Sequence, residues 1–300
     1  MITRRVISRH NPLFTKMRKY DTIDFASEMP MPVYYHTAQS LFCFLCDPYV
    51  YYRTYVQEVL PKPPIIRKQT EMLYKYKLLN PDGFDNRFNW NSPINDSTRK
   101  PFGEDTVKYS LWAEKVHRDG QIPLHPSTLE IATTAHQQTM AQLADGFVPL
   151  LKEVLAPDGQ TSIQLTALIN KSNCYAHIDR LTAAGNICKV MLIPSLDTIN
   201  DTLMPTEIVL TLTLQAEMLK KDMADIPWAY AVLAEYLPPY RVIVRKILTE
   251  QYSQALTQMI KKVNDALGSV DTGVWMSKHT TENINTAHFP STLPLLKLWI

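Results

Sequence analysis

The second half of the chain has the clearest pattern of apolar and polar positions. Apolar residues at helical spacing predict a helix over 143–155, and a turn follows at 156–160. A short helix is then expected over 163–169 and a longer one over 172–184, with a tight turn at 170–171. These segments predict two consecutive helices joined by a short turn, after a first helix that supports them.

The pattern changes after Gly185, a residue suited to the left-handed position at the end of a helix. Continuous apolar runs predict strands over 187–193 and 208–213, separated by a polar loop. This order of helices and strands is typical of a winged helix-turn-helix, here at about 143–215. The expected fold class is therefore mainly α (α+β), with a winged helix-turn-helix in the second half and additional helical regions.

The remaining segments differ in composition, which suggests four parts. An aromatic-rich stretch over 33–60 is followed by a polar, Asn- and Pro-containing linker over 81–106, and a helical pattern runs from 214 to 267. The expected parts are a basic N-terminal arm (1–30), an aromatic-rich domain or subdomain ending in the linker (31–106), the winged-helix domain (107–215) and a helical C-terminal region (216–300).

Composition limits the possible functions. Glycine is scarce, with 8 residues against 21 prolines, so phosphate-cradling glycine loops are not expected. No apolar stretch is long enough for a membrane span, and the chain starts without a secretory signal, which predicts no membrane partner. The four cysteines, Cys43, Cys46, Cys174 and Cys188, then indicate reduced thiols and a cytoplasmic protein.

The predicted second helix has small and polar residues early, as entry into a major groove requires. Its basic residues are suited to phosphates, which position the helix without reading sequence. The basic start of the chain is typical either of an arm on DNA or of a solvated terminus. The candidate DNA-binding residues are Lys171, Ser172, Asn173, Tyr175, Ala176, Arg180, Lys189, Arg4, Arg5 and Arg9.

Two phrases carry a resemblance to a known family. The segment 177–218, which includes Pro-Thr-Glu-Ile-Val-Leu-Thr-Leu-Thr-Leu over 205–214, resembles RepA-type replication initiators of IncFII-like plasmids. Asn-Pro-Leu-Phe-Thr over 11–15 is similar to an early phrase of that family. The resemblance implies binding to double-stranded DNA at a plasmid origin, strand opening and recruitment of host replication proteins. The sequence leaves open whether the protein is a homo-oligomer.

Motifs for enzyme chemistry are not evident in the sequence. It has no nucleophile elbow, phosphate loop or His-Glu-x-x-His motif, and the spacing of Cys43 and Cys46 supplies only half of a zinc site. The sequence therefore predicts neither catalytic residues, metal ligands nor a cofactor, and the chain is expected not to be an enzyme. Alternative functions are a winged-helix transcription regulator and a structural or adaptor protein of a mobile element or virion.

Overall fold

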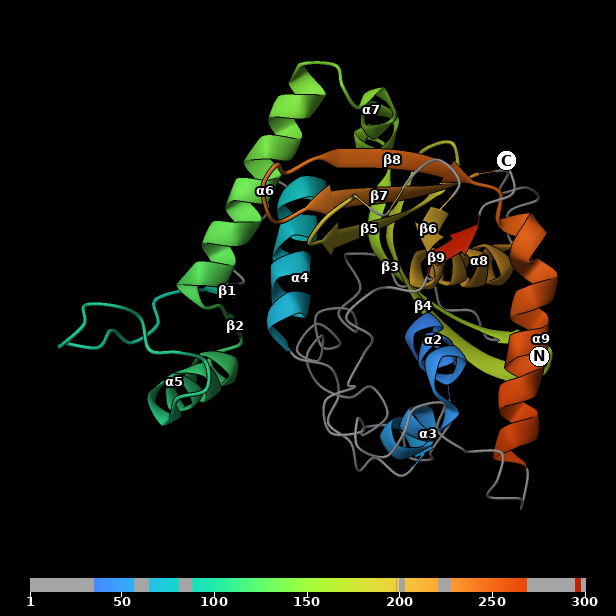
Figure 1. Ribbon diagram of the computed structural model, residues 1–300, viewed down its shortest axis with the longest axis horizontal. Coiled ribbons are helices and arrows are strands. Elements are labelled where there is room, and N and C mark those ends of the chain that lie inside the picture. Colours follow the sequence, from blue (N-terminus) through green and yellow to red (C-terminus); the bar gives the residue numbers. More distant parts are fainter. Residues whose placement is uncertain are drawn as a thin grey trace.

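The computed structural model describes residues 35–56, 65–80, 88–197, 199, 203–220, 228–268 and 295–297. Its centre is a five-stranded mixed sheet with the strand order β3-β4-β5-β7-β8 (Figure 1). The strands are β3 (Gln160–Ile169), β4 (Ser172–Leu181), β5 (Ile187–Ile193), β7 (Ala229–Glu235) and β8 (Val242–Ile247). All neighbours in this sheet are antiparallel except β5 and β7.

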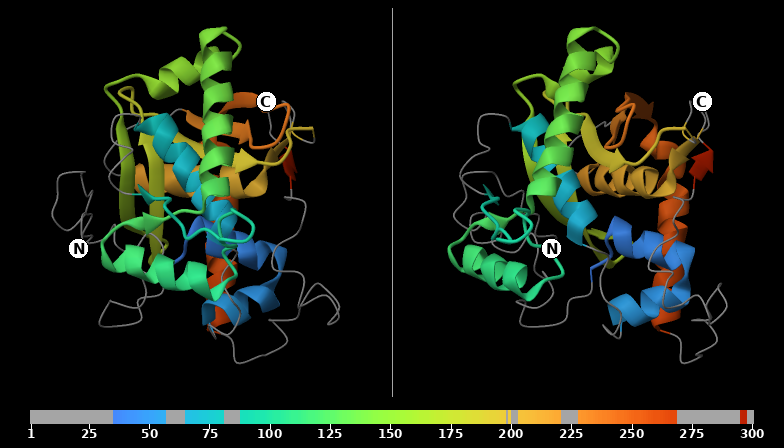
Figure 2. Two further views of the ribbon diagram at one scale, coloured as in Figure 1. Left: turned by 90° about the vertical axis from the view of Figure 1, so that its left-hand side faces the viewer. Right: turned by 60° about the vertical axis from the view of Figure 1, so that its left-hand side comes forward.

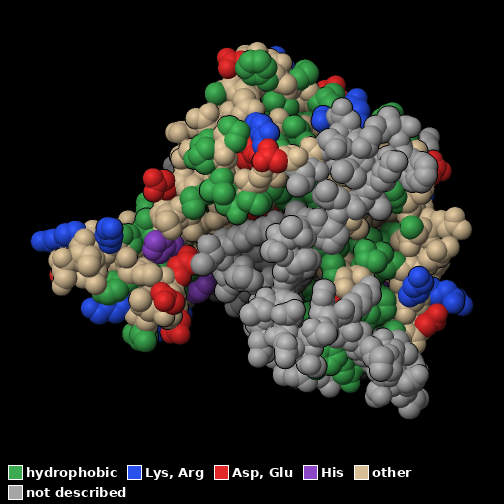
Figure 3. Space-filling view, viewed as in Figure 1, with side chains coloured by type: hydrophobic (Ala, Val, Ile, Leu, Met, Phe, Trp, Pro, Cys, Tyr) green, Lys and Arg blue, Asp and Glu red, His purple; other side chains and the backbone are tan. Residues whose placement is uncertain are grey.

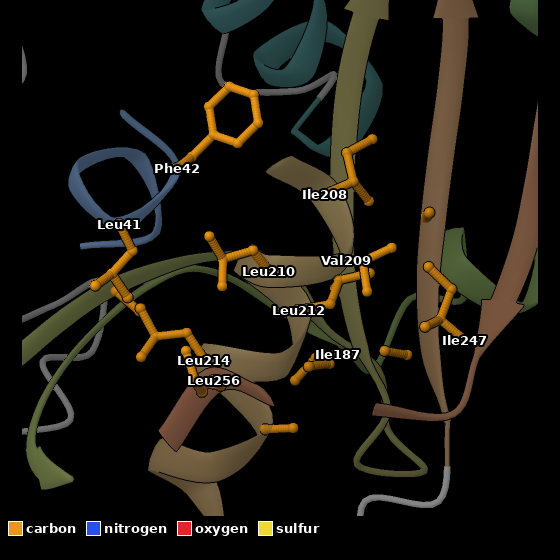
Figure 4. Close-up of a cluster of buried hydrophobic side chains, with 14 of the residues drawn as sticks. Leu41, Phe42, Ile187, Ile208, Val209, Leu210, Leu212, Leu214, Ile247 and Leu256 are labelled. Atoms are coloured by element: carbon orange, nitrogen blue, oxygen red, sulfur yellow. The ribbon is translucent and has the colours of Figure 1, made fainter. Parts of the chain in front are cut away.

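Helix α8 (Thr206–Leu219) connects the two parallel strands, because parallel neighbours need a crossover and cannot be joined by a tight turn. It packs on one face of the sheet together with α2 (Ala38–Cys46) and α9 (Ser253–Leu267). Figure 4 shows Leu41 and Phe42 of α2 near Leu210 of α8, in the apolar core on this face.

The opposite face is covered by α4 (Ile65–Leu79), α6 (Pro126–Ala144) and α7 (Pro149–Leu155), which lie in front of the sheet in Figure 2. Leu73 and Tyr74 of α4 are fully buried there. The sheet is thus an inner layer between two layers of helices, which explains why β7 is buried along its whole length.

The shorter elements lie around this three-layer core. Helix α3 (Pro48–Tyr51) and a π-helical turn (Tyr52–Val56) follow α2, and a 3₁₀ turn (Thr249–Tyr252) precedes α9. Strand β6 (Leu203–Pro205) pairs with β9 (Leu295–Lys297). A further unit, β1 (Phe88–Asn89), α5 (Val107–Arg118) and β2 (Ile122–Pro123), projects from the sheet as an arm, with Lys and Arg side chains visible at its outer end in Figure 3.

The predicted winged helix-turn-helix and the mainly α fold are wrong. The two segments expected to be helices, 163–169 and 172–184, lie largely in β3 and β4, which form an antiparallel hairpin. Asn170 and Lys171 form its turn with φ of 49° and 66°, and two positive φ angles match the twist of a hairpin. In β4 the buried residues Cys174, Ala176 and Ile178 alternate, as in a strand with one buried face.

Of the two predicted strands, one is confirmed and one is wrong. The strand over 187–193 is confirmed as β5, whereas the strand over 208–213 is wrong, since these residues lie within α8. Helix α8 also spans the expected boundary between residues 215 and 216, and the sheet takes strands from both sides of it. Among the described residues, no helix is long and apolar enough to cross a membrane.

Candidate functional site at the β4–β5 junction

The pairing between β4 and β5 is short. It comprises Arg180 with Cys188 and Leu181 with Ile187, whereas β5 pairs with β7 along all seven residues. Pairing between β3 and β4 is also interrupted once, at Asp179 and the opposite residue Ser162. Ser162 has a φ of 57°, so the backbone leaves the extended conformation at this point.

The interruption reverses the alternation of side chains along β4. Ile178 and Leu181 both pack in the α8-side core although they are three residues apart, an odd spacing for a regular strand. Arg180 and its partner Cys188 point to the other face, where the Arg180 guanidinium donates to the Ala156 carbonyl after α7. Asp179 therefore lies at a bulge, directly where the β4–β5 ladder ends.

Two carboxylates take the place of the backbone acceptors that β5 lacks on this side. Oδ2 of Asp179 accepts a hydrogen bond from the Val190 amide at 2.8 Å, and Oε2 of Glu71 accepts one from the Leu192 amide at 3.3 Å. Buried backbone amides need such partners, since an unsatisfied one is costly. Helix α4 brings Glu71 to this edge, and Asn80, directly after the helix, accepts a hydrogen bond from the Thr161 hydroxyl of β3 at 3.1 Å.

Three cationic or titratable side chains complete the site. The Lys75 ammonium is 2.6 Å from Oε1 of Glu71 and 3.3 Å from Oδ2 of Asp179. The Lys189 ammonium is 3.5 Å from Oδ2 of Asp179, and Nδ1 of His177 is 3.5 Å from Oδ1. We call these five residues, Glu71, Lys75, His177, Asp179 and Lys189, the Asp179 cluster.

Charge balance keeps Asp179 and Lys75 ionised in spite of their burial. Burial alone would raise the pKa of Asp179, but the ammonium groups of Lys189 and Lys75, together with His177, outweigh it and hold this pKa far below its usual range. Burial would likewise lower the pKa of Lys75, but Asp179 and Glu71 raise it above the ordinary lysine value. The site thus combines fixed negative and positive charges at neutral pH.

The residues present do not fit a dedicated metal site. The Lys75 ammonium already lies between the carboxylates of Glu71 and Asp179, where a cation shared by both would have to bind. Over the ranges that the structure describes, no three His, Cys, Asp or Glu side chains are arranged to hold a metal ion. The positive charge next to Asp179 is therefore supplied by lysines.

The sequence-predicted DNA contacts are dispersed by the fold. Lys171 is exposed at the hairpin turn, Ala176 is buried in the core, and Ser172 is buried and accepts a hydrogen bond from the Asn264 amide at 2.6 Å. Asn173 and Tyr175 are half-buried, and their backbones bond to His36.

Only Lys189 of the predicted set belongs to the Asp179 cluster. The Arg180 side chain is committed to the carbonyl after α7, and a Cβ at Gly159 would come within 2.8–2.9 Å of its guanidinium. The remaining predicted contacts, Arg4, Arg5 and Arg9, lie outside the described residues.

Four residues of the cluster were missed from the sequence. Glu71 and Lys75 stand four residues apart, which places them on one helix face, and His177 and Asp179 alternate on a strand. Each spacing is a local signal, but neither indicates that the two pairs meet.

No family model and no curated protein matches the sequence. Among solved structures, the fold is similar to that of a protein described as a putative exonuclease from Eubacterium rectale. The TM-score is 0.50 at 8% sequence identity, and the match covers 94% of this chain and 99% of the other. The likeness concerns the fold, and it supports an α/β architecture in place of the expected mainly α one.

The same likeness corrects a second prediction. The chain was expected not to be an enzyme, because its sequence shows no standard catalytic motif. This expectation is not kept, because the fold is similar to that of a protein described as a putative exonuclease. Short sequence motifs miss a site whose charged groups come from separate elements, as in the Asp179 cluster.

Proposed function

We propose that this chain hydrolyses phosphodiester bonds of nucleic acid at the Asp179 cluster. One observation carries the proposal: a buried carboxylate lies between two lysine ammonium groups where the β4–β5 ladder ends. Such a charged arrangement is costly to bury, and strongly perturbed pKa values gather at functional sites. The similarity of the fold to that of a protein described as a putative exonuclease supports the choice of substrate.

The chemistry of phosphodiester hydrolysis matches the charges of the cluster. Negative charge grows on the phosphoryl oxygens in the transition state, and preorganised cations stabilise it strongly in a site with little water. Lys189 and Lys75 are held in place by Asp179 and Glu71, and each side chain is 17% exposed. Their ammonium groups are thereby preorganised, and a phosphate that approaches needs only a small rearrangement to meet them.

The free thiols bear on the cellular compartment of the protein, and the proposed substrate bears on its binding partner. Cys43, Cys46, Cys174 and Cys188 are all free thiols, which supports a reducing compartment such as the cytoplasm. The proposed partner is a nucleic acid. Binding to a plasmid origin or to host replication proteins is still only a prediction from the family resemblance. Binding at an origin would have to use residues other than a recognition helix, because that segment forms β3 and β4.

The test measures hydrolysis of end-labelled single-stranded and duplex DNA and of RNA, with and without added divalent cations. Lys189→Met keeps the length of the side chain and removes its charge, and we expect the rate to fall by about 100-fold or more. Lys261→Met is the matched control, since it removes an exposed lysine on α9, on the other face of the sheet, and should leave the rate unchanged. Thermal unfolding of both variants checks that they fold.

The result that overturns the proposal is a folded wild-type chain that hydrolyses none of these substrates. Equal rates for the wild type and Lys189→Met would also overturn it, because the cluster would then not be the centre. A gel shift on the DNA that flanks the coding sequence tests origin binding separately: a specific binder prefers it to random DNA by about 1000-fold or more.

A further inference from the structure

We propose that His177 is the proton-transfer residue of the Asp179 cluster, oriented by Asp179 and acting on the water that attacks the phosphodiester. This inference rests on the proposed hydrolysis and assigns a role that the charges of the lysines cannot fill. Hydrolysis requires a group that accepts a proton from water, and histidine is the residue that most often does so.

The two oxygens of Asp179 have different partners. Oδ2 receives the Val190 amide and lies near the ammonium groups of Lys75 and Lys189. Oδ1 lies 3.5 Å from Nδ1 of His177. A carboxylate at this nitrogen favours the tautomer with its proton on Nδ1, which leaves Nε2 as the free base. The carboxylate therefore orients the imidazole from the Nδ1 side and leaves Nε2 to accept a proton, as a general base needs.

Exposure separates the roles of the two residues. The Asp179 side chain is 2% exposed, whereas that of His177 is 40% exposed. A nucleic acid or a water molecule from solvent can reach the imidazole, but it cannot reach the carboxylate without displacing its neighbours. His177 is accordingly the member of the cluster through which a proton passes between solvent and the buried charges.

The backbone of His177 is held from both directions. Nε2 of Gln215 on α8 donates to the His177 carbonyl at 2.7 Å, and Gln215 is fully buried. On the other side, His177 pairs with Gln164 across β3 and β4. A catalytic group must be fixed by rigid elements, and a central position on a paired strand provides this.

Gln164 supplies an independent observation. Its side chain is only 6% exposed, and its Oε1 atom has no hydrogen-bond partner among the described residues. Directly opposed residues in an antiparallel pair project on the same side, so the Gln164 side chain leaves the sheet on the same face as that of His177. A water that donates to this acceptor while facing the imidazole would satisfy it.

The proposed step is balanced as follows. A lone pair of the water oxygen forms the new bond to phosphorus while Nε2 of His177 takes a proton from that water. The bond from phosphorus to the leaving oxygen breaks, its electron pair stays on that oxygen, and the oxygen takes up a proton from solvent, to which His177 afterwards releases its own. Asp179 on β4 faces His177 directly. Lys189 on β5 and Lys75 on α4 contact Asp179, and Glu71 on α4 contacts Lys75, so these charged groups surround the carboxylate that orients the imidazole.

The experiment compares the wild type with His177→Asn and His177→Ala, and with His117→Asn as a control on the exposed face of α5. General base catalysis is typically worth about 10²–10⁴-fold, so kcat of His177→Asn should fall by about 100-fold or more. The wild type and the control should lose activity at acid pH, where an imidazole takes up a proton. The residual activity of His177→Asn should not show this loss at acid pH. Added imidazole should restore the activity of His177→Ala.

A readout without substrate accompanies these rates. The ring ¹⁵N shifts of His177 should show the proton on Nδ1 in the wild type, and Asp179→Asn should disturb that tautomer. If the wild type hydrolyses nucleic acid and His177→Asn stays within threefold of it, this inference fails and the proposed function stands. A slow variant that keeps the wild-type pH profile, with no rescue by imidazole, also overturns it. A wild type without activity refutes both.

Discussion

The two sides of β5 follow different rules. Towards β7, all seven residues pair, and the buried side chains there are mostly apolar, for example Val232 and Leu233, with the buried carboxylate of Glu235 at the end of the strand. Towards β4, only two residues pair, and the next two amides that face this side bond to the carboxylates of Asp179 and Glu71. The first side satisfies its backbone within the sheet, and the second satisfies it with charged side chains.

The difference shows how a chemically useful site arises in an ordinary sheet. Where a ladder ends inside a protein, the exposed amides must find new acceptors, and a carboxylate is a strong one. A buried carboxylate then needs cations, which Lys75 and Lys189 supply. Backbone geometry thus places charges in the interior that side-chain packing alone would not have favoured.

The largest effect is expected for Asp179→Asn, which keeps the shape and the acceptor for the Val190 amide but removes the charge. Two lysine ammonium groups then stay buried without their main partner, and breaking a buried pair in this way costs about 3–5 kcal/mol. Urea unfolding at neutral pH measures the loss. Asp197→Asn removes an exposed carboxylate from its ion pair with Arg241 and should leave stability unchanged.

The pH dependence sharpens this prediction. The pKa of Asp179 is lower in the folded chain than in the unfolded chain, so its contribution is present above about pH 4 and is lost as the pH falls further. The stability curves of the wild type and Asp179→Asn should therefore converge in acid. Curves that stay parallel down to about pH 2 would contradict a paired, ionised Asp179.

A smaller effect is expected at the second carboxylate. Glu71→Leu leaves the Leu192 amide without its acceptor, and an unsatisfied buried donor costs about 1–3 kcal/mol. Glu71→Gln keeps an acceptor and should lose clearly less. Hydrogen exchange of the Leu192 amide in the two variants measures the difference. Equal losses for both would mean that the charge of Glu71, and not its role as an acceptor, stabilises the junction.

The smallest effect is expected next to the paired part of the junction, at Gly159. A Cβ there would come within 2.8–2.9 Å of the Arg180 guanidinium, which can move because it ends a flexible side chain. Gly159→Ala should therefore cost about 1 kcal/mol, the value of one hydrogen bond, here that of Arg180 to the Ala156 carbonyl. Thermal unfolding measures the change. A loss as large as that of Asp179→Asn would show that the two parts of the junction do not differ.

Part of the fold was accessible from the sequence. Strand β5 was predicted with its observed bounds, because a continuous apolar run between polar segments is typical of a strand buried on both faces. Gly185 was expected in a left-handed conformation and has a φ of 81°, although it serves the turn between β4 and β5 and not the end of a helix.

The β3–β4 hairpin shows why the rest was missed. Cys174, Ile178 and Leu181 match helical spacing, but the same segment also alternates at Cys174, Ala176 and Ile178. The reversal of side chains at Asp179 places Leu181 in the same core as Ile178, which produces a helix-like spacing in a strand. Short segments with both periods are decided by the neighbours they pack against.

The sequence by itself determined the local features: a strand over 187–193, a reversal at Asn170 and Lys171, and the pairs Glu71–Lys75 and His177–Asp179 at spacings that bring side chains together. Only the tertiary structure decided that α4 crosses β5 and that β4 leaves it after two residues, which brings the two pairs into one cluster. The physical reason is that backbone pairing and helix packing join residues about a hundred positions apart, and such contacts depend on the whole fold and leave no period in the sequence.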